Sequence, residues 1–446
     1  MKRLFILLCC LVCAPAVTSA QTEPLRLTLA DAIARGLEAS HRVDELSARQ
    51  DAARAVADQR DAAQRPQVAA IASYTRTNHV EEFSVPNASG GVRVIYPDIP
   101  NNVRSRIDLQ WPIYTGGRLQ ASTRAANAEA DALGHDRDAL RADLKLEITR
   151  AFWAVQTARA SLDVVRQALE RTSAHLADVR NQLSVGLVPP SDVLSIEAQH
   201  AQQRMVSIEA ESLVTTATAE LKRLVGIDQD ASVELLAGAP VDIGIARPRP
   251  GKPLFSTKES MGDVRTHRPE RESLVLRISA ADDRIRAASA GSLPVLTAVG
   301  GYDMARPNPR IFPIQEKWAP SWDIGIHVRW SLFDGGRVRA ETAEAAANRR
   351  AVEARLRDFD AGVEVEVRQR IAELESAAAA IEAADAGVRA AREARRVIGE
   401  RFSAGVATNT DVLTAETALL QGELDLMRAR ANGELAAARL DRALGR

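Results

Sequence analysis

The sequence predicts a mainly α-helical chain with a membrane β-barrel part: a long coiled-coil helical barrel combined with four strands per chain. Three observations support this fold class. The chain repeats itself at a constant offset of 219 positions, two proline-free segments of 67 residues are rich in helix formers, and segments that alternate apolar and polar residues precede both. A repeat this long indicates that each half builds the same large unit, not one turn of a solenoid.

The first twenty residues have the pattern of a secretory signal peptide. Lys2 and Arg3 precede an apolar run over 4–12 and small residues at 18–20, so we expect cleavage after Ala20. All the cysteines lie in this segment, at Cys9, Cys10 and Cys13. The mature chain is therefore expected to have no disulfide and no thiolate chemistry.

Composition excludes several classes of function. Without Lys2 and Arg3, 56 basic residues stand against 59 acidic ones, a net charge of −3, which does not favour nucleic-acid binding. No stretch of the mature chain has 18 consecutive apolar residues, so we expect no transmembrane helix. We expect no cofactor and no metal, because the histidines have no metal-binding spacing and neither a phosphate loop nor a nucleophile elbow occurs.

Each half begins with a helix and two strands. Helices are expected over 27–65, interrupted near Ser40, and over 263–290. Strands are expected over 107–113 and 322–333, because apolar and polar residues alternate there. Their upstream partners are expected over 66–74 and 294–302, which both begin at Pro and end at Tyr with small and branched residues between. The segment 322–333 exceeds the roughly 9–11 residues that a tilted strand needs to cross a bilayer. All the tyrosines and most tryptophans lie in or beside these strands, as in the aromatic girdles of outer-membrane barrels.

Glycine pairs mark the change from strand to helix. Residues 111–118 (WPIYTGGR) return as 330–337 (WSLFDGGR). We expect these glycines to allow positive φ or a sharp change of direction. The four glycines are Gly116, Gly117, Gly335 and Gly336.

Very long helical hairpins follow. The segments 118–184 and 337–403 would each be roughly 100 Å long as helices, and both carry apolar residues in steps of seven, which predicts coiled-coil packing. Returning helices are expected over 191–224 and 410–444. The first repeat thus covers 21–226 and the second 263–446, joined by a Pro- and Gly-rich linker over 227–262.

The leader, the duplicated strand–Gly-Gly–long helix unit and the Gly…Asp-Val-Leu turns resemble the TolC family of outer-membrane channel proteins. The resemblance implies a homotrimer in which twelve strands complete a barrel in outer-membrane lipid and the helices continue across the periplasm. It also implies a passive exit duct of a tripartite efflux or type I secretion system, with a periplasmic adaptor protein and an inner-membrane transporter as partners. Four strands alone cannot close a barrel, which agrees with three chains.

The resemblance also assigns roles at the hairpin turns. Asp192 and Asp411 would form a periplasmic gate. The commonest explanation of such residues is capping of the following helices or an interaction with the helix dipole, together with Ser191 and Thr410, and this does not exclude a gate. Thr414 and Ser195 stand where some relatives have a further acid, which implies a weaker gate. The tips that would contact the adaptor are Val185, Gly186, Leu187, Ala404, Gly405 and Val406.

Other functions remain as alternatives. A structural or adhesive coiled-coil protein anchored in the outer membrane is the second hypothesis, and it predicts no ion conductance. A periplasmic adaptor is the third, although the duplicated membrane-type strands disfavour it. Gly186 and Gly405 can also be explained as helix C-terminal glycines, and His327 as a solvated polar residue. An enzyme is the least favoured class.

Overall fold

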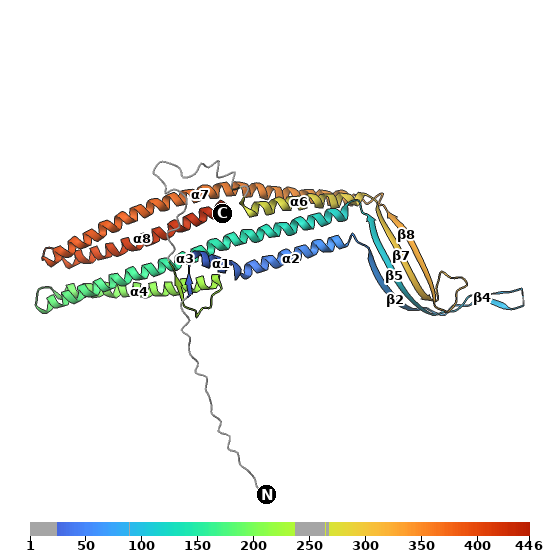
Figure 1. The fold of residues 1–446 in the computed structure, drawn as a ribbon, viewed down its shortest axis with the longest axis horizontal. Helices are drawn as coiled ribbons and strands as arrows, with labels where there is room; N and C mark the ends of the chain where they lie inside the picture. Colours follow the sequence, from blue (N-terminus) through green and yellow to red (C-terminus); the bar gives the residue numbers. More distant parts are fainter. Residues whose placement is uncertain (1–24, 89, 237–263, 265–266) are drawn as a thin grey trace, which may run out of the picture. The chain divides into compact units, whose positions relative to one another are not determined.

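The computed structural model describes residues 25–88, 90–236, 264 and 267–446 (Figure 1). The predicted signal peptide and most of the predicted linker lie outside these residues. The described residues fall into two compact units. We call the first the hairpin unit (within Met1–Ala39, Glu147–Ile245 and Ala380–Leu435) and the second the sheet unit (within Ser40–Leu146, Ala246–Ala379 and Ala436–Arg446).

The long helices have the predicted bounds. Helix α3 spans Arg118–Ser184 and α7 spans Arg337–Ser403, and their returning partners are α4 (Pro190–Val225) and α8 (Asn409–Ala443). Alanine, leucine, glutamate and arginine dominate α3 and α7, so the helical state is favoured locally along their whole length. Most residues of the seven-residue steps are buried, and Ile148, Val155 and Val367 are at most 1% exposed. Leu169 and Ile381, which belong to the same steps, are half-buried.

The hairpin unit also holds the start of the chain. Strand β1 (Leu25–Leu27) pairs in parallel with β6 (Val233–Leu235), and α1 (Leu29–Glu38) follows. The prediction of a helix from residue 27 was therefore wrong by two residues at its start. The cause is a pairing between segments about 208 positions apart, which local propensity does not reveal. A capping box between Thr28 and Asp31 begins α1.

The sheet unit contains a four-stranded antiparallel sheet. Its order is β2 (Gln67–Arg76), β5 (Asn101–Tyr114), β7 (Val295–Arg306), β8 (Ala319–Arg329), which agrees with the four predicted strands. The predicted strand 322–333 was wrong at both ends. Val295, the first residue of β7, pairs with Arg329, so Trp330 and the residues after it pair with no strand of the described part of the chain.

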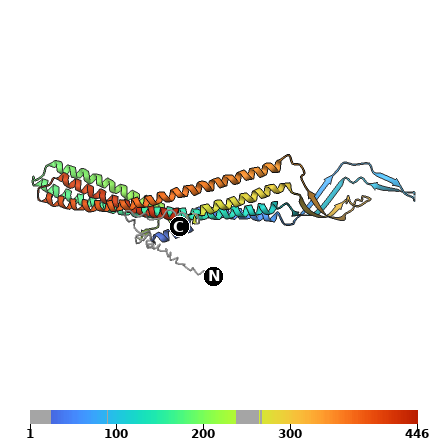
Figure 2. The ribbon, with the colours of Figure 1, turned by 90° about the horizontal axis from the view of Figure 1, so that it is seen from above.

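Helices of the sheet unit lie beside one another in the order α2, α3, α6, α7 (Figures 1 and 2). Helix α2 spans His41–Ala62, as the predicted interruption at Ser40 requires, and α6 spans Pro269–Ser289 before the short helix η1 (Ala290–Ser292). The loop after β2 holds one further hairpin, β3 (Phe83–Pro86) and β4 (Val92–Tyr96), which was not among the predicted strands. Among the described helices, none is long and apolar enough to cross a membrane.

Candidate functional site: the two-faced sheet and the hairpin tips

The four-stranded sheet has two chemically different faces. The pairing register aligns Ile107 with Tyr302 and Tyr302 with Trp322, so these side chains share one face. This face is apolar and exposed over all four strands, including Val68, Tyr74, Ile107, Leu109, Trp111, Tyr302, Trp322, Ile324, Ile326 and Val328. An exposed apolar surface of this extent marks contact with lipid or with another protein.

The opposite face carries a network of ion pairs. Arg106 on β5 donates from Nε to Asp108 Oδ1 at 2.7 Å and from both terminal nitrogens to Asp323 on β8, at 2.9 and 3.2 Å. Arg106 also contacts Asp303 on β7, whose other oxygen accepts from Arg104 Nε at 2.5 Å. These residues were not among the predicted site residues. The signal was present, because charges stand at every second position of 104–108.

The loop between β7 and β8 folds back onto this charged face. Arg310 donates to Trp322 O at 2.8 Å, and its Nη2 lies 3.0 Å from Asp323 Oδ1. Asn308 is buried and donates to Ala319 O at 2.9 Å and Ser321 Oγ at 3.0 Å. His327 lies exposed on the same face, as expected. No group of three or more metal-binding side chains occurs among the described residues.

The strand-to-helix turns use glycine as predicted. All four glycines have positive φ, at 64° and 81° for Gly116 and Gly117 and at 68° and 89° for Gly335 and Gly336. Left-handed backbone of this kind strongly favours glycine over residues with a side chain. In the second turn, Asp334 also accepts from the backbone N–H groups of Gly336 and Val338, at 2.9 and 3.0 Å.

The two hairpin tips of the hairpin unit share one backbone design. Gly186 and Gly405 have φ of 75° and 74°. Leu187 N donates to Gln182 O, and Val406 N donates to Arg401 O, both at 2.9 Å, which is the hydrogen bond of a Schellman helix end. The simple explanation of both glycines as helix C-terminal residues is therefore confirmed. The tips expose Val185, Leu187 and Val406, each more than 60% accessible.

The two aspartates after the tips differ in their surroundings. Asp411 forms a capping box with Thr408: its carboxylate accepts from Thr408 Oγ1 at 2.7 Å and from Thr408 N at 2.8 Å. Both hydrogen bonds hold the pKa of Asp411 below its usual value, and the bond from the Thr408 hydroxyl has the larger effect. Asp192 lies in the first turn of α4, whose N-cap is Pro189 and which has no side-chain cap.

The expected capping partners were wrong. Ser191 and Thr410 lie inside their helices, and Thr408 is the residue that bonds Asp411. Thr408 and Pro189 occupy equivalent positions of the two repeats, so one repeat has a capping hydroxyl and the other has none. Ser195 and Thr414 turn their hydroxyls back to Ser191 O and Thr410 O, at 2.9 and 2.8 Å.

A contact between the two hairpins lies near these aspartates. Asn409 is buried and donates to the backbone oxygen of Asp192 at 3.3 Å, while its own oxygen lies 2.8 Å from His175 Nε2. The ring of His175 meets that of Phe402 edge to face, with centroids 5.2 Å apart. Asn409 was missed because it replaces Pro190 of the first repeat, and only a search for differences between the repeats would find it.

A second contact between the hairpins is an ion-pair network. Glu416 on α8 is 7% exposed and accepts from Arg171 Nε on α3 at 3.0 Å and Arg395 Nε on α7 at 2.7 Å. Phe402 and Leu413 of the second hairpin also pack on the apolar core of the first, formed by Leu176, Val179, Val193 and Ile196. The hairpins are thus held together by both apolar and charged contacts.

Known proteins share this combination of long paired helices and a small antiparallel sheet. The solved structure of the outer membrane protein VceC from Vibrio cholerae covers 94% of this chain and 96% of its own, with 20% identity and a TM-score of 0.77. Protein CyaE of Bordetella pertussis is 27% identical over 324 residues, which are 72% of this chain and 65% of that protein. Outer membrane protein TolC of Vibrio cholerae is 24% identical over 68% of this chain and 67% of its own length.

These similarities define the class as transport proteins of the outer membrane, not enzymes. The profile of the family described as outer membrane efflux protein matches residues 32–227 and 262–446, most of the chain, and the chain belongs to this family. The predicted resemblance and the outer-membrane location are confirmed. Alignment with CyaE spans just under two thirds of that relative.

Proposed function

We propose that three copies of this chain form a passive exit duct of a tripartite efflux or type I secretion system. The observation that carries the proposal is the sheet of four strands with one apolar face and one charged face, whose edge strands β2 and β8 are each paired on one side only among the described residues. Unpaired edges pair readily with other strands. Joining β8 of each copy to β2 of the next would close a barrel of twelve strands, with the apolar face toward lipid and Arg106 toward the lumen.

The hairpin tips would bind a periplasmic adaptor protein that belongs to an inner-membrane pump. Support comes from the exposure of Val185, Leu187 and Val406, since apolar groups grouped at a surface favour contact with another protein. The matching Schellman turns of Gly186 and Gly405 would present Leu187 and Val406 alike, so one adaptor surface could bind either tip. Ala404 would complete the second tip.

Asp192 and Asp411 would line the periplasmic entrance. In a trimer they would provide six carboxylates, which attract cations and repel anions. Asn409, the first residue of α8, donates a hydrogen bond to the backbone oxygen of Asp192 in the first turn of α4. This bond supports a common position for the starts of α4 and α8. Opening would then require the hairpins to shift, which the contacts of Asn409 and Glu416 oppose.

Conductance across a planar lipid bilayer tests this function. The purified protein, with a native mass of three mature chains, is expected to produce cation-selective current. Asp411→Asn is expected to lower the cation selectivity, because it removes carboxylates that attract cations. A trimer that never conducts would favour the structural or adhesive alternative. Family membership weighs against that alternative, because the matching profile describes efflux proteins.

A further inference from the structure

The core of the first hairpin changes from apolar to polar at one level. Near the tip, Val179 of α3 and Ile196 of α4 belong to one apolar cluster. Because the two helices are antiparallel and core positions recur in steps of seven, the next level lies seven residues before Val179 and seven after Ile196. These positions hold Thr172 and Gln203, and each residue is only 2% exposed.

The polar atoms of this level have no hydrogen-bond partner among the described residues. They are Thr172 Oγ1 and both side-chain polar atoms of Gln203, Nε2 and Oε1, and all of them are buried. Two buried atoms of the neighbouring ion-pair network share this condition: Arg171 Nη2 on α3 and Glu423 Oε2 on α8, which lie 4.0 Å apart. Native proteins pair nearly all such atoms with protein groups or with ordered water, because an unpaired buried polar group is costly.

Helix α8 lies against both helices of the first hairpin at this level. Gln199 of α4 donates to Thr417 Oγ1 of α8 at 3.3 Å, and Glu416 of α8 accepts from Arg171 Nε of α3 at 3.0 Å. The atoms without a partner therefore belong to one region where α3, α4 and α8 meet. This region combines a hydroxyl, an amide, a guanidinium and a carboxylate, so it offers both donors and acceptors.

Water is the ligand that fits this region. A buried water molecule typically makes about three hydrogen bonds to polar groups that would otherwise be unsatisfied. Glu423 disfavours an anion and Arg171 disfavours a cation, whereas a neutral water suits both. Their 4.0 Å separation is too long for a direct hydrogen bond and suits one bridging water. The next level away from the tip has the small buried side chains of Ala168 and Ser207, which leave room for water.

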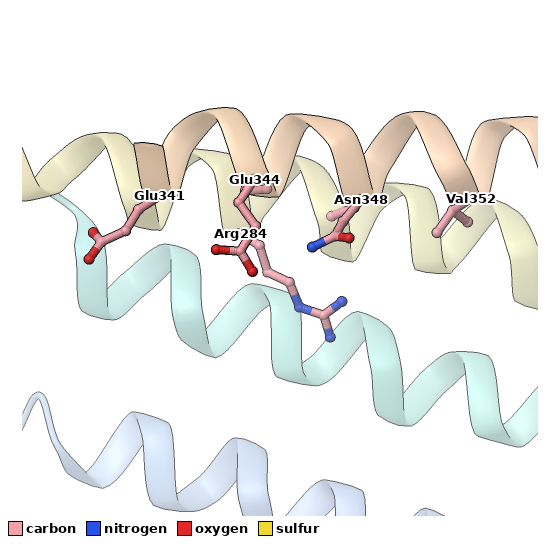
Figure 3. A pocket seen from close by; sticks show the side chains of 7 residues that line it. Arg284, Glu341, Glu344, Asn348 and Val352 are labelled. Atoms are coloured by element: carbon pink, nitrogen blue, oxygen red, sulfur yellow. The ribbon is translucent and has the colours of Figure 1, made fainter. Parts of the chain in front are cut away.

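An open groove in the sheet unit shows the opposite situation. It lies between α6 and α7, has a volume of about 330 Å³ and carries Arg284, Glu344 and Asn348 on its walls (Figure 3). Glu344 and Asn348 are exposed, so their polar ends bond to bulk solvent and need no partner in the protein. The level of Thr172 and Gln203 has no such exposure, so water at this level must be held by the protein.

The polar level is specific to the first hairpin. The repeat equivalents of Thr172 and Gln203 in the second hairpin are Ala391 and Gly422. A Cβ added to Gly422 would lie 3.6 Å from Val388 Cγ2, so α8 packs closely on α7 at this position. The second hairpin therefore has small apolar residues where the first has a hydroxyl and an amide.

We propose that ordered water molecules occupy the polar level of the hairpin unit. One water bridges Thr172 to Gln203 inside the first hairpin, and another bridges Arg171 to Glu423 between the two hairpins. The site lies within a single chain, so it does not depend on the proposed duct or on its number of chains.

A crystal structure or an electron cryomicroscopy map of the detergent-extracted protein, at a resolution that shows ordered water, tests the site directly. Water density is expected between Thr172 Oγ1 and the Gln203 amide, and between Arg171 Nη2 and Glu423 Oε2. A direct hydrogen bond within either pair, or a map without density between the partners, would overturn the site.

Urea unfolding provides a second measurement, which does not require the water to be visible. Thr172→Val or Gln203→Leu alone is expected to lower the unfolding midpoint, because each removes one partner of the shared water. The double variant is expected to recover at least the midpoint of the unaltered protein, since two apolar side chains need no water.

Matched controls lie on the exposed surface of α4. Thr216→Val and Gln202→Leu change the same residue types where the side chains reach solvent, and their small effects on the midpoint are expected to add. Losses at Thr172 and Gln203 that add in the same way would show that the two side chains share no water, and the proposal would fall.

Discussion

Arg106 and Asp323 form a two-bond ion pair across a strand that lies between them. Arg106 is on β5 and Asp323 on β8, with β7 in the middle of the three. The residue beneath the guanidinium is Gly301, which pairs with Asp108 on one side and Asp323 on the other. The missing side chain leaves the space in which Arg106 reaches three carboxylates.

Gly301→Ala is expected to displace Arg106, because the new Cβ would overlap the guanidinium. Asp108 and Asp323 would lose their counter-charge, so the lumen of the proposed barrel would become more attractive to cations. The reversal potential in a bilayer under a KCl gradient should therefore move toward the potassium equilibrium potential. Gly325→Ala is the control: it lies on the same face, and its nearest neighbour is a Val299 methyl at 3.8 Å. Equal effects of the two variants would contradict the steric role of Gly301.

Glu416→Gln is expected to destabilise the contact between the hairpins. Arg171 and Arg395 would both lose the buried charge that they share, and breaking such a pair costs about 3 kcal/mol. The control is Glu197→Gln, the repeat equivalent, where a 40% exposed carboxylate binds Arg180 alone. An exposed pair contributes less than about 1 kcal/mol. Urea unfolding of the detergent-extracted protein, followed by helical circular dichroism, measures both, and similar midpoints would refute the buried role.

Thr408→Val is expected to raise the pKa of Asp411 toward its usual value, since the hydroxyl bond to Thr408 is the largest cause of the depression. A pKa lowered by folding means that the ionised group stabilises the folded state above the ordinary pKa. That stabilisation is lost as the pH falls through the lowered pKa. The pKa of Asp411 is measured from the NMR chemical shift of its carboxyl carbon as a function of pH, with the signal assigned by comparison with Asp411→Asn. Thr414→Val serves as control, because its hydroxyl bonds Thr410 O.

Gly405→Pro is expected to abolish export while three chains still assemble. Proline cannot adopt the φ of 74°, and it would remove the N–H that donates to Phe402 O at 3.0 Å. The backbone of the tip that we propose as a docking surface would therefore change. An export assay in the producing host measures the loss of export, and native mass spectrometry measures whether three chains still assemble. Gly399→Ala in α7 is the control, since its added Cβ meets nothing within 4 Å. Unchanged export by the proline variant would count against docking at this tip.

The helices and turns were largely predictable because their causes are local. Alanine, glutamate, arginine and leucine favour a helix wherever they stand. The glycines at 116–117 and 335–336 adopt positive φ, a conformation that glycine reaches without help from tertiary contacts. Both 67-residue helices were therefore predicted with the bounds that the structure has. The repeat also predicted that the two tips would have the same form.

Contacts between distant segments needed the tertiary structure. Strand β8 ends at Arg329 because β7 begins at Val295, a limit set by the partner strand and not by the alternation that continues to Phe333. Thr408, not Thr410, caps α8, because the helix begins at Asn409, one residue before the expected start, and Thr408 directly precedes it. The repeat also led to the expectation that both tips are alike, although Thr408 and Asn409 stand where the first repeat has Pro189 and Pro190.

The sequence by itself determined the duplication, the long helical hairpins, the four strands and the family resemblance. Each of these depends on spacing or propensity along the chain. Only the tertiary structure decided that Arg106 reaches Asp323, that Glu416 joins two arginines and that Asn409 links the two hairpins. The physical reason is that a hydrogen bond or ion pair depends on distances of about 3 Å, and such distances between remote residues are fixed only when the helices and strands pack.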